Sequence, residues 1–161
     1  MNPRIQLLID SLKLQPHPEG GYYGEFFRSS HSVGADQDRP RRLALTSIHF
    51  LLVTGQCSRW HRVLSDEVWS HLEGQPLELS CFDTESGQLR TILLGTYDSG
   101  TQPVFVVPAG CWQAAQPLGE YTLVGCTVGP GFEFVDFSLA ADLPDVARAI
   151  RALGKSSEKL L

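Results

Sequence analysis

Short apolar runs alternate with polar residues through most of the chain and predict a protein built mainly of β-strands. Stretches rich in Val, Leu, Ile, Phe and Tyr are separated by Gly, Pro, Ser and Asp, which is the pattern of short strands joined by turns. No long helical pattern interrupts them, so we expect an all-β sandwich or jelly-roll barrel and not a parallel sheet with crossover helices. The expected strands cover residues 21–29, 42–53, 58–63, 67–72, 77–83, 88–94, 102–107, 121–128 and 132–139.

A short amphipathic helix is predicted at each end of this β-rich region. The first covers about residues 3–13, where Asn2 can cap the helix and apolar residues recur at helical spacing. The second covers about residues 144–153, and Gly154 suits its C-terminal end. We expect residues 155–161 to form a loose tail.

Length and composition fit one globular domain, with the barrel at about residues 20–140. A chain of 161 residues can bury about 70% of its unfolded surface. The contents of 42% hydrophobic and 19% charged residues are ordinary for a soluble domain. The formal net charge of -5 argues against general nucleic-acid binding, which depends on clustered Lys and Arg. The short run of Arg39, Arg41 and Arg42 is interpreted as a solvated loop.

Other sequence signals favour a cytoplasmic protein without a membrane partner. No apolar run approaches the roughly 20 residues that a membrane-spanning helix needs. The N-terminal segment contains charged residues inside its apolar stretch, unlike a secretion signal. The cysteines lack the paired spacing of a zinc site or a disulfide framework, and we expect free thiols at Cys57, Cys81, Cys111 and Cys126.

The segment from Gly55 to Gly74 carries the clearest chemical pattern. His61 and Glu67 stand at the spacing of a metal-binding hairpin in small β-barrels, but Val63 occupies the position of a second histidine. Side chains alternate along a strand, so His61 and Val63 share one face. If the two strands pair through a turn at 64–66, His61 and Glu67 point into the same interior.

A divalent metal at this site would need further ligands from another strand. Gln113 occupies the favourable position near the Pro-Ala-Gly turn, but an amide oxygen is a weak ligand for a transition metal. We therefore expect no cofactor and no firmly bound metal. If a metal is bound, the expected ligands are His61, Glu67 and Gln113.

Four motifs in order extend this picture to most of the chain. PHPEGGYY (16–23), WHRVLSDEVW (60–69), VVPAGCWQAA (106–115) and YTLVGCTVGPGFEFVDF (121–137) resemble an uncharacterised subfamily of the cupin superfamily. The resemblance covers about residues 5–140. It implies a jelly-roll barrel that is usually a homodimer and is related in shape to the epimerases that make dTDP-rhamnose. The subfamily implies no defined activity.

The candidate catalytic residues are His61, Glu67 and a tyrosine. His61 is a candidate general base, which Glu67 would orient and whose pKa Glu67 would raise. Tyr22, or its neighbour Tyr23, is a candidate acid at the barrel mouth. The structural alternatives are a buried core histidine, an exposed turn carboxylate and a packed tyrosine.

Further residues are candidates for ligand binding. Gln113 could hydrogen-bond a ligand through both ends of its amide, or else tie off a loop. Trp69 shares a strand face with Glu67 and could stack on a sugar or base, although most aromatic residues here are expected in the core. Glu19 and Tyr23 could line the mouth, and Arg28 could hold an anionic group or simply face solvent.

Three functional hypotheses follow. The first is a cupin that binds a small sugar-like or nucleotide-linked ligand and performs metal-independent acid–base isomerisation or epimerisation. The second is a non-catalytic binding or sensory module that uses the same pocket. The third is a metal-dependent isomerase or dioxygenase in which His61 and Glu67 are joined by a further ligand, namely His49, His71 or His17.

Overall fold

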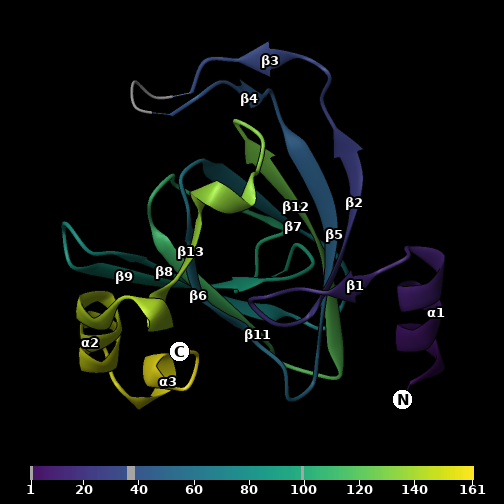
Figure 1. Cartoon of the computed structure of the whole chain (residues 1–161). Coiled ribbons are helices and arrows are strands. Elements are labelled where there is room, and N and C mark those ends of the chain that lie inside the picture. The colour runs from purple at the N-terminus through teal and green to yellow at the C-terminus, as the bar shows by residue number, and fades with distance from the viewer. Residues whose placement is uncertain (1, 36–38, 99) are drawn as a thin grey trace.

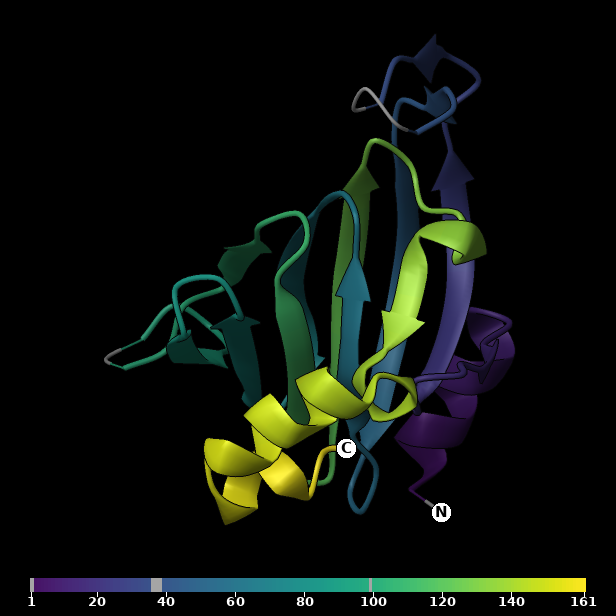
Figure 2. The same cartoon turned by 60° about the vertical axis from the view of Figure 1, so that its left-hand side comes forward.

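The computed structural model describes residues 2–35, 39–98 and 100–161. Two antiparallel β-sheets face each other and form a jelly roll (Figures 1 and 2), which confirms the predicted fold class. The larger sheet contains, in spatial order, β1 (Gln15–Pro16), β2 (Tyr22–Arg28), β5 (Thr46–Val53), β12 (Tyr121–Gly129), β7 (Asp66–Gly74) and β10 (Val104–Val107). The smaller contains β13 (Phe137–Leu139), β6 (Ser58–Val63), β11 (Trp112–Pro117), β8 (Leu77–Asp83) and β9 (Gln88–Leu94).

The main core lies between the two sheets because each contributes its apolar inward face. Phe50 and Leu52 of β5 meet Leu77 and Leu79 of β8 in one buried cluster. Alternation along β5 is regular enough that its outward-facing Leu51 joins a different cluster. This arrangement leaves a polar cavity at one end of the sandwich, described below.

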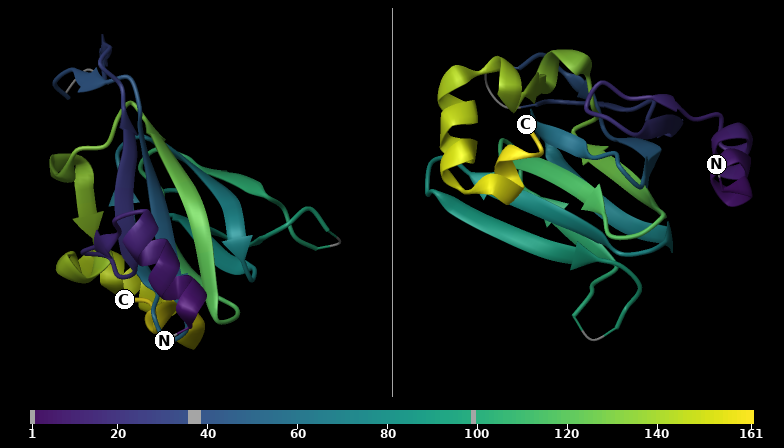
Figure 3. Two further views of the ribbon diagram at one scale, coloured as in Figure 1. Left: turned by 90° about the vertical axis from the view of Figure 1, so that its right-hand side faces the viewer. Right: turned by 90° about the horizontal axis from the view of Figure 1, so that it is seen from below.

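Helices pack on part of the outer face of each sheet (Figure 3). Helix α1 (Pro3–Ser11), capped by Asn2 as predicted, packs Ile5 and Leu8 against Leu51 on the larger sheet. Helix α2 (Pro144–Ala152) packs Ile150 with residues on the outer face of the smaller sheet.

The C-terminal tail is ordered, and the prediction of a loose tail is wrong. Residues Lys155–Glu158 form helix α3, and Leu160 is 6% exposed. The Trp60 indole Nε1 donates a hydrogen bond to the Ser157 carbonyl at 2.8 Å, and the Trp60 amide donates to the Leu160 carbonyl at 2.9 Å. A buried tryptophan N–H needs a partner, and the tail supplies it.

Two strand predictions need correction, and one central strand was missed. The stretch 42–53 is divided into β4 (Arg42–Leu43), which pairs with β3 (Ser32–Val33), and β5. The stretch 132–139 contains a 3-10 helix, η1 (Phe134–Asp136), followed by the short β13, and a second 3-10 helix, η2 (Ala140–Asp142), precedes α2. The central strand β11 was not predicted, because its alanines and glutamines have low β-propensity.

The expected hairpin between His61 and Glu67 is also absent. β6 pairs with β11 and β13, whereas β7 pairs with β12 and β10. The intervening turn therefore carries the chain from one sheet to the other. In contrast, the turn after Asp83 does join a true hairpin, in which Asp83 pairs with Gln88.

Candidate functional site

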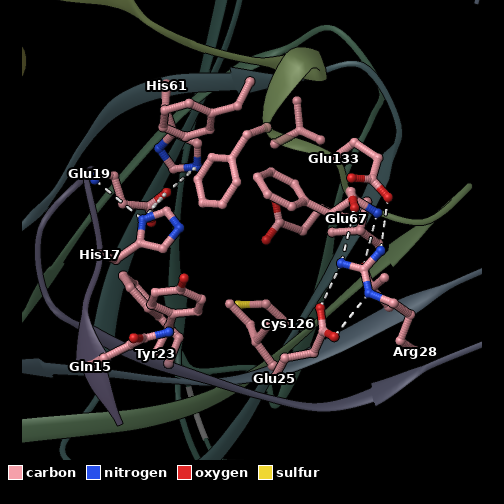
Figure 4. Close-up of a pocket in the computed structure, with 18 residues that line it drawn as sticks. Gln15, His17, Glu19, Tyr23, Glu25, Arg28, His61, Glu67, Cys126 and Glu133 are labelled. Carbon is pink, nitrogen blue, oxygen red and sulfur yellow. Dashed lines mark hydrogen bonds and ion pairs between the residues drawn. The ribbon is translucent and has the colours of Figure 1, made fainter.

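A cavity of about 300 Å³ opens between the two sheets (Figure 4). Its size is at the lower end of the range for small-molecule sites. Residues from both sheets, from the turn before β2 and from the segment after β12 line it: Gln15, His17, Glu19, Tyr23, Glu25, Arg28, Thr46, Ile48, Phe50, His61, Val63, Glu67, Cys126, Val128, Phe132, Glu133, Phe134 and Phe137. Three of the candidate residues from the sequence, His61, Glu67 and Glu19, are among them.

His61 projects from β6 with its ring almost fully buried. Its Nδ1 lies 2.7 Å from the Arg59 carbonyl oxygen. A carbonyl can only accept, so Nδ1 carries a proton and a neutral ring presents the Nε2 lone pair. Nε2 lies 3.2 Å from Oε2 of Glu19. The Arg59 carbonyl and Glu19 therefore orient this ring.

Glu67 affects the pKa of the His61 ring through its charge. In the described structure, the two side chains form no hydrogen bond with each other. The Glu67 carboxylate favours the protonated imidazole, as predicted. Burial has the larger and opposite effect, so the pKa of His61 is lowered overall. His61 is therefore neutral near pH 7.

Glu19 lies between two histidines at the inner end of the cavity. The Ser58 hydroxyl donates a hydrogen bond to Oε1 of Glu19 at 2.7 Å. His17 Nδ1 lies 3.4 Å from Oε2 and also accepts the Glu19 backbone N–H at 3.3 Å. Burial raises the pKa of Glu19 to about 6. Since Nδ1 of His61 carries the ring proton, Oε2 of Glu19 faces the Nε2 side of that ring.

Glu67 enters the cavity from β7, on the opposite sheet from His61. The Gln113 Nε2 amide donates to Glu67 Oε2 at 2.6 Å, while Gln113 Oε1 accepts the Trp69 indole N–H at 2.9 Å. The Cys126 thiol is also hydrogen-bonded to Glu67. Burial raises the pKa of Glu67 to about 7, and this is the largest effect on the group.

The side chains of Gln113 and Trp69 lie behind the residues that line the cavity. Both side chains are fully buried and neither lines the cavity surface, so the predicted ligand contact by Gln113 and the predicted stacking wall of Trp69 are not supported. Together they form a hydrogen-bonded chain that fixes the Glu67 carboxyl group. An alternation argument placed Trp69 on the correct face, but it could not show that Gln113 lies between the ring and the cavity.

The two neighbouring tyrosines face opposite sides of β2. Tyr23 lines the cavity, with its ring centroid 4.6 Å from that of His17. Tyr22 packs in the cluster beneath helix α1, on the outer face of the sheet. Tyr22 therefore cannot be the catalytic acid, and Tyr23 is the tyrosine available to a ligand.

Arg28 lies at the exposed end of the cavity, bound by two carboxylates (Figure 4). Its Nε and Nη2 donate to Glu25 at 3.0 and 2.8 Å, and its Nη1 donates to Glu133 at 2.9 Å. These acids raise the pKa of Arg28, which keeps its charge. The guanidinium that was a candidate for holding an anionic ligand is thus occupied by the protein's own acids.

The segment after β12 forms an aromatic wall that the sequence argument assigned to the core. Phe132, Phe134 and Phe137 line the cavity, and Phe134 remains 53% exposed. Arg42 anchors this segment through two hydrogen bonds to Asp136, at 2.8 and 2.9 Å. Arg42 is therefore a buried ion-pair partner, which corrects the prediction of a solvated loop at this position.

The residues present do not fit the metal site that the central motif suggested. Val63 lines the cavity where a second histidine is required, and both ends of the Gln113 amide are engaged by Trp69 and Glu67. His17 Nδ1 accepts a backbone N–H, which leaves that lone pair unavailable to a metal. In the described part of the chain, no cluster of three or more His, Cys, Asp or Glu residues has metal-binding geometry.

Two other histidines considered as alternative ligands lie away from the cavity. The His49 ring packs against Phe26, with centroids 4.5 Å apart, and neither lines the cavity. His71 pairs with Val124 across the larger sheet and also does not line the cavity. The four cysteines are free thiols, as predicted, and the structure adds Cys126 to the cavity wall.

The fold and the cavity define a jelly-roll protein of the cupin type, and sequence comparison agrees. The profile of a cupin superfamily group described as DUF985 matches residues 6–140. The chain therefore belongs to the DUF985 family of the cupin superfamily. The search of curated proteins found no match.

Solved structures support the same assignment. A protein of Shewanella oneidensis is 36% identical with a TM-score of 0.80, and the match covers 96% of this chain and 94% of that one. A hypothetical protein from Leishmania major is 34% identical with a TM-score of 0.79, covering 88% and 90%. The oxalate decarboxylase of Lactobacillus farciminis, solved as a formate complex, is 16% identical with a TM-score of 0.59, covering 83% and 35%, so the likeness is one of fold.

Among the described residues, no helix has both the length and the apolar character to cross a bilayer.

Proposed function

We propose that this chain binds a small, sugar-like carbonyl compound in its cavity and moves a proton on it, as an isomerase or epimerase does. The observation that carries the proposal is the placement of two proton carriers on different walls of one cavity. Glu67, with a pKa of about 7, comes from the larger sheet. Glu19, with a pKa of about 6, lies beside His61 of the smaller sheet. Groups that titrate near neutral pH suit general acid–base catalysis.

The proposed reaction uses these two carriers as base and acid. Ionised Glu19, which has the lower pKa, takes the proton from the carbon next to the carbonyl group, and the electron pair of the broken C–H bond moves into that carbonyl. Protonated Glu67, which has the higher pKa, then protonates the resulting enolate from the other wall. This assignment gives His61 the role of orienting the base, whereas the sequence suggested that it is the base. Tyr23, which lines the cavity, would hydrogen-bond the substrate.

Hydrogen exchange with solvent tests the proposal. The protein is incubated in D₂O with a panel of unphosphorylated aldoses, ketoses and keto sugars, and deuterium incorporation is followed by NMR. We expect exchange on at least one compound and a loss of about 100-fold or more in Glu67→Gln, since a general acid or base contributes at least that much. The matched control is Glu85→Gln, which changes an exposed turn carboxylate. Equal exchange in Glu67→Gln and wild type would contradict the proposal.

A binding module without catalysis is the second candidate, favoured by the fact that the chain's own groups already satisfy Glu19 and Glu67. Ser58 and Gln113 each donate a hydrogen bond to one of these carboxyl groups. Saturable binding of a panel compound with no deuterium incorporation would favour this function over isomerisation.

A further inference from the structure

The cavity brings aromatic rings and carboxyl groups together. Tyr23, Phe50, Phe132, Phe134 and Phe137 all line it. Within the segment after β12, the ring of Phe132 lies 5.1 Å from that of Phe134 in an edge-to-face arrangement. The faces of aromatic rings attract cations, and cages of such rings are a common means of recognising quaternary and primary ammonium groups.

The charges around these rings are predominantly negative. Glu19 and Glu67 lie inside the cavity, and Glu25 and Glu133 lie at its exposed end. Among the described residues that line the cavity, Arg28 is the sole Arg or Lys. Its guanidinium is shared by Glu25 and Glu133, which leaves one net negative charge at the exposed end.

The histidines do not reverse this balance. Burial lowers the pKa of both His17 and His61, so each ring is neutral near pH 7. An anionic group that entered the cavity would meet carboxylates at the exposed end and, among the described lining residues, no free Arg or Lys behind them. A cation would meet the same carboxylates and several aromatic side chains.

We infer that the ligand of this cavity carries an organic ammonium group. This group is recognised by the aromatic wall of Phe132, Phe134 and Phe137 and by the carboxylates of Glu25 and Glu133. The inference rests on the proposed function only in placing the ligand in the same cavity. It narrows the ligand class to amine-bearing or quaternary ammonium compounds, and it disfavours phosphorylated and nucleotide-linked sugars.

Three probes of one shape test this inference. Choline, its neutral isostere 3,3-dimethylbutan-1-ol and the anion 3,3-dimethylbutanoate are titrated into ¹⁵N-labelled protein, and chemical-shift changes are followed. We expect choline to bind with cavity residues shifted, the neutral isostere to bind about tenfold more weakly, and the anion to bind most weakly. Equal or tighter binding of the alcohol or the anion would overturn the inference, as would no binding of choline.

Charge-neutral variants then test whether Glu25 and Glu133 cause the preference for choline. In the double variant Glu25→Gln/Glu133→Gln, choline should lose most of its advantage in affinity over the neutral isostere. The anion 3,3-dimethylbutanoate should bind this variant more tightly than wild type, because the Arg28 guanidinium is released from its two carboxylate partners. Both acids are partly exposed, so the double variant should fold normally. Glu85→Gln is the matched control and should leave all three affinities unchanged. An unchanged choline preference in the double variant would contradict the assignment of these carboxylates.

An aromatic variant separates the ring contribution from the charge. Phe134→Leu retains an apolar side chain at a half-exposed position and should weaken choline binding several-fold while sparing the neutral isostere. Glu67→Gln should retain the order of the three probes, even though it removes the proposed acid. Failure of the isomerase proposal and failure of the ammonium inference therefore give different results.

Discussion

At the scale of single residues, Glu67 illustrates how the protein makes a buried acid useful. The group is taken out of water, which raises its pKa to about 7, while Gln113 and Cys126 give it hydrogen bonds. The Trp69 indole fixes the orientation of the Gln113 amide. A carboxyl group held in this way can accept or release a proton without large movement.

The first prediction concerns the pH dependence of stability. Glu67 has a higher pKa in the folded chain, about 7, than its ordinary value of 4.5. The folded state therefore binds more protons between these values, and its free energy of unfolding falls as pH rises through that range. Glu67→Gln removes this fall. We expect urea denaturation to show the variant gaining up to about 3 kcal/mol relative to wild type between pH 4.5 and 8.

The control for that measurement is Glu120→Gln, an exposed carboxylate. Its stability relative to wild type should be nearly independent of pH over the same range. A Glu67→Gln difference that is equally flat would show that the Glu67 carboxyl group titrates normally.

The second prediction concerns the support of Glu67. Gln113→Leu has nearly the same volume but removes the amide, which leaves the Trp69 N–H and one Glu67 oxygen without their partners. The expected loss in the free energy of unfolding is roughly 1–3 kcal/mol. Gln88→Leu, at an exposed strand position, should change stability little. A Gln113→Leu protein as stable as wild type would show that the hydrogen bonds of Gln113 to Trp69 and Glu67 do not contribute to stability.

The sequence could predict which residue types enter the cavity better than it could predict their roles. His61, Glu67, Glu19, Tyr23 and Arg28 all line it. Their partners could not be predicted, because contacts such as those of Arg28 with Glu133 join residues distant along the chain. The choice between adjacent tyrosines depends on the phase of β2, which two preceding glycines leave undefined in the sequence.

At the scale of elements, the turn between β6 and β7 determines from which sheets His61 and Glu67 enter the cavity. A tight hairpin would have placed His61 and Glu67 on neighbouring strands of one sheet. The chain instead crosses between sheets, so the two residues reach the cavity from different walls. Both arrangements satisfy the same alternation of side chains, and local sequence cannot distinguish them. Strand β11 was missed for a different reason, because its alanines have low β-propensity although Ala114 and Ala115 are buried in the fold.

The third prediction tests the ordered tail. Leu160→Ala removes a side chain that packs with Trp60 and Ile150 beneath α2. We expect a loss of roughly 2–4 kcal/mol in the free energy of unfolding, as for other buried leucines. The control is Leu118→Ala, whose side chain is 51% exposed. If both variants lose the same small amount, the C-terminal residues do not contribute to the core.

At the scale of the whole molecule, the inside and the outside of the jelly roll have different roles. The space between the sheets provides both the apolar core and the cavity, whereas helices cover part of the outside. The outer face of the larger sheet retains exposed apolar side chains, including Leu72, Val104 and Val106. Such side chains on an open sheet are commonly protected by association.

The fourth prediction is that two copies of the chain associate through this outer face. Sedimentation equilibrium should give a mass of twice 17.8 kDa for wild type. Leu72→Lys with Val106→Lys should shift the protein toward the monomer, because each charge would be buried at the contact. Leu118→Lys, at another exposed leucine, should leave the mass unchanged. A monomeric wild-type protein would contradict the prediction, and an unchanged dimer in the double variant would place the contact elsewhere.

The central claim is that the cavity holds two carboxyl groups that titrate near neutral pH. The most direct test is ¹³C NMR of protein labelled at the glutamate side-chain carboxyl carbons, with Glu67→Gln and Glu19→Gln used to assign the resonances. The account predicts that Glu19 titrates near 6 and Glu67 near 7, above the ordinary value of 4.5. If both resonances titrate at or below that ordinary value, the cavity does not contain the proposed proton carriers.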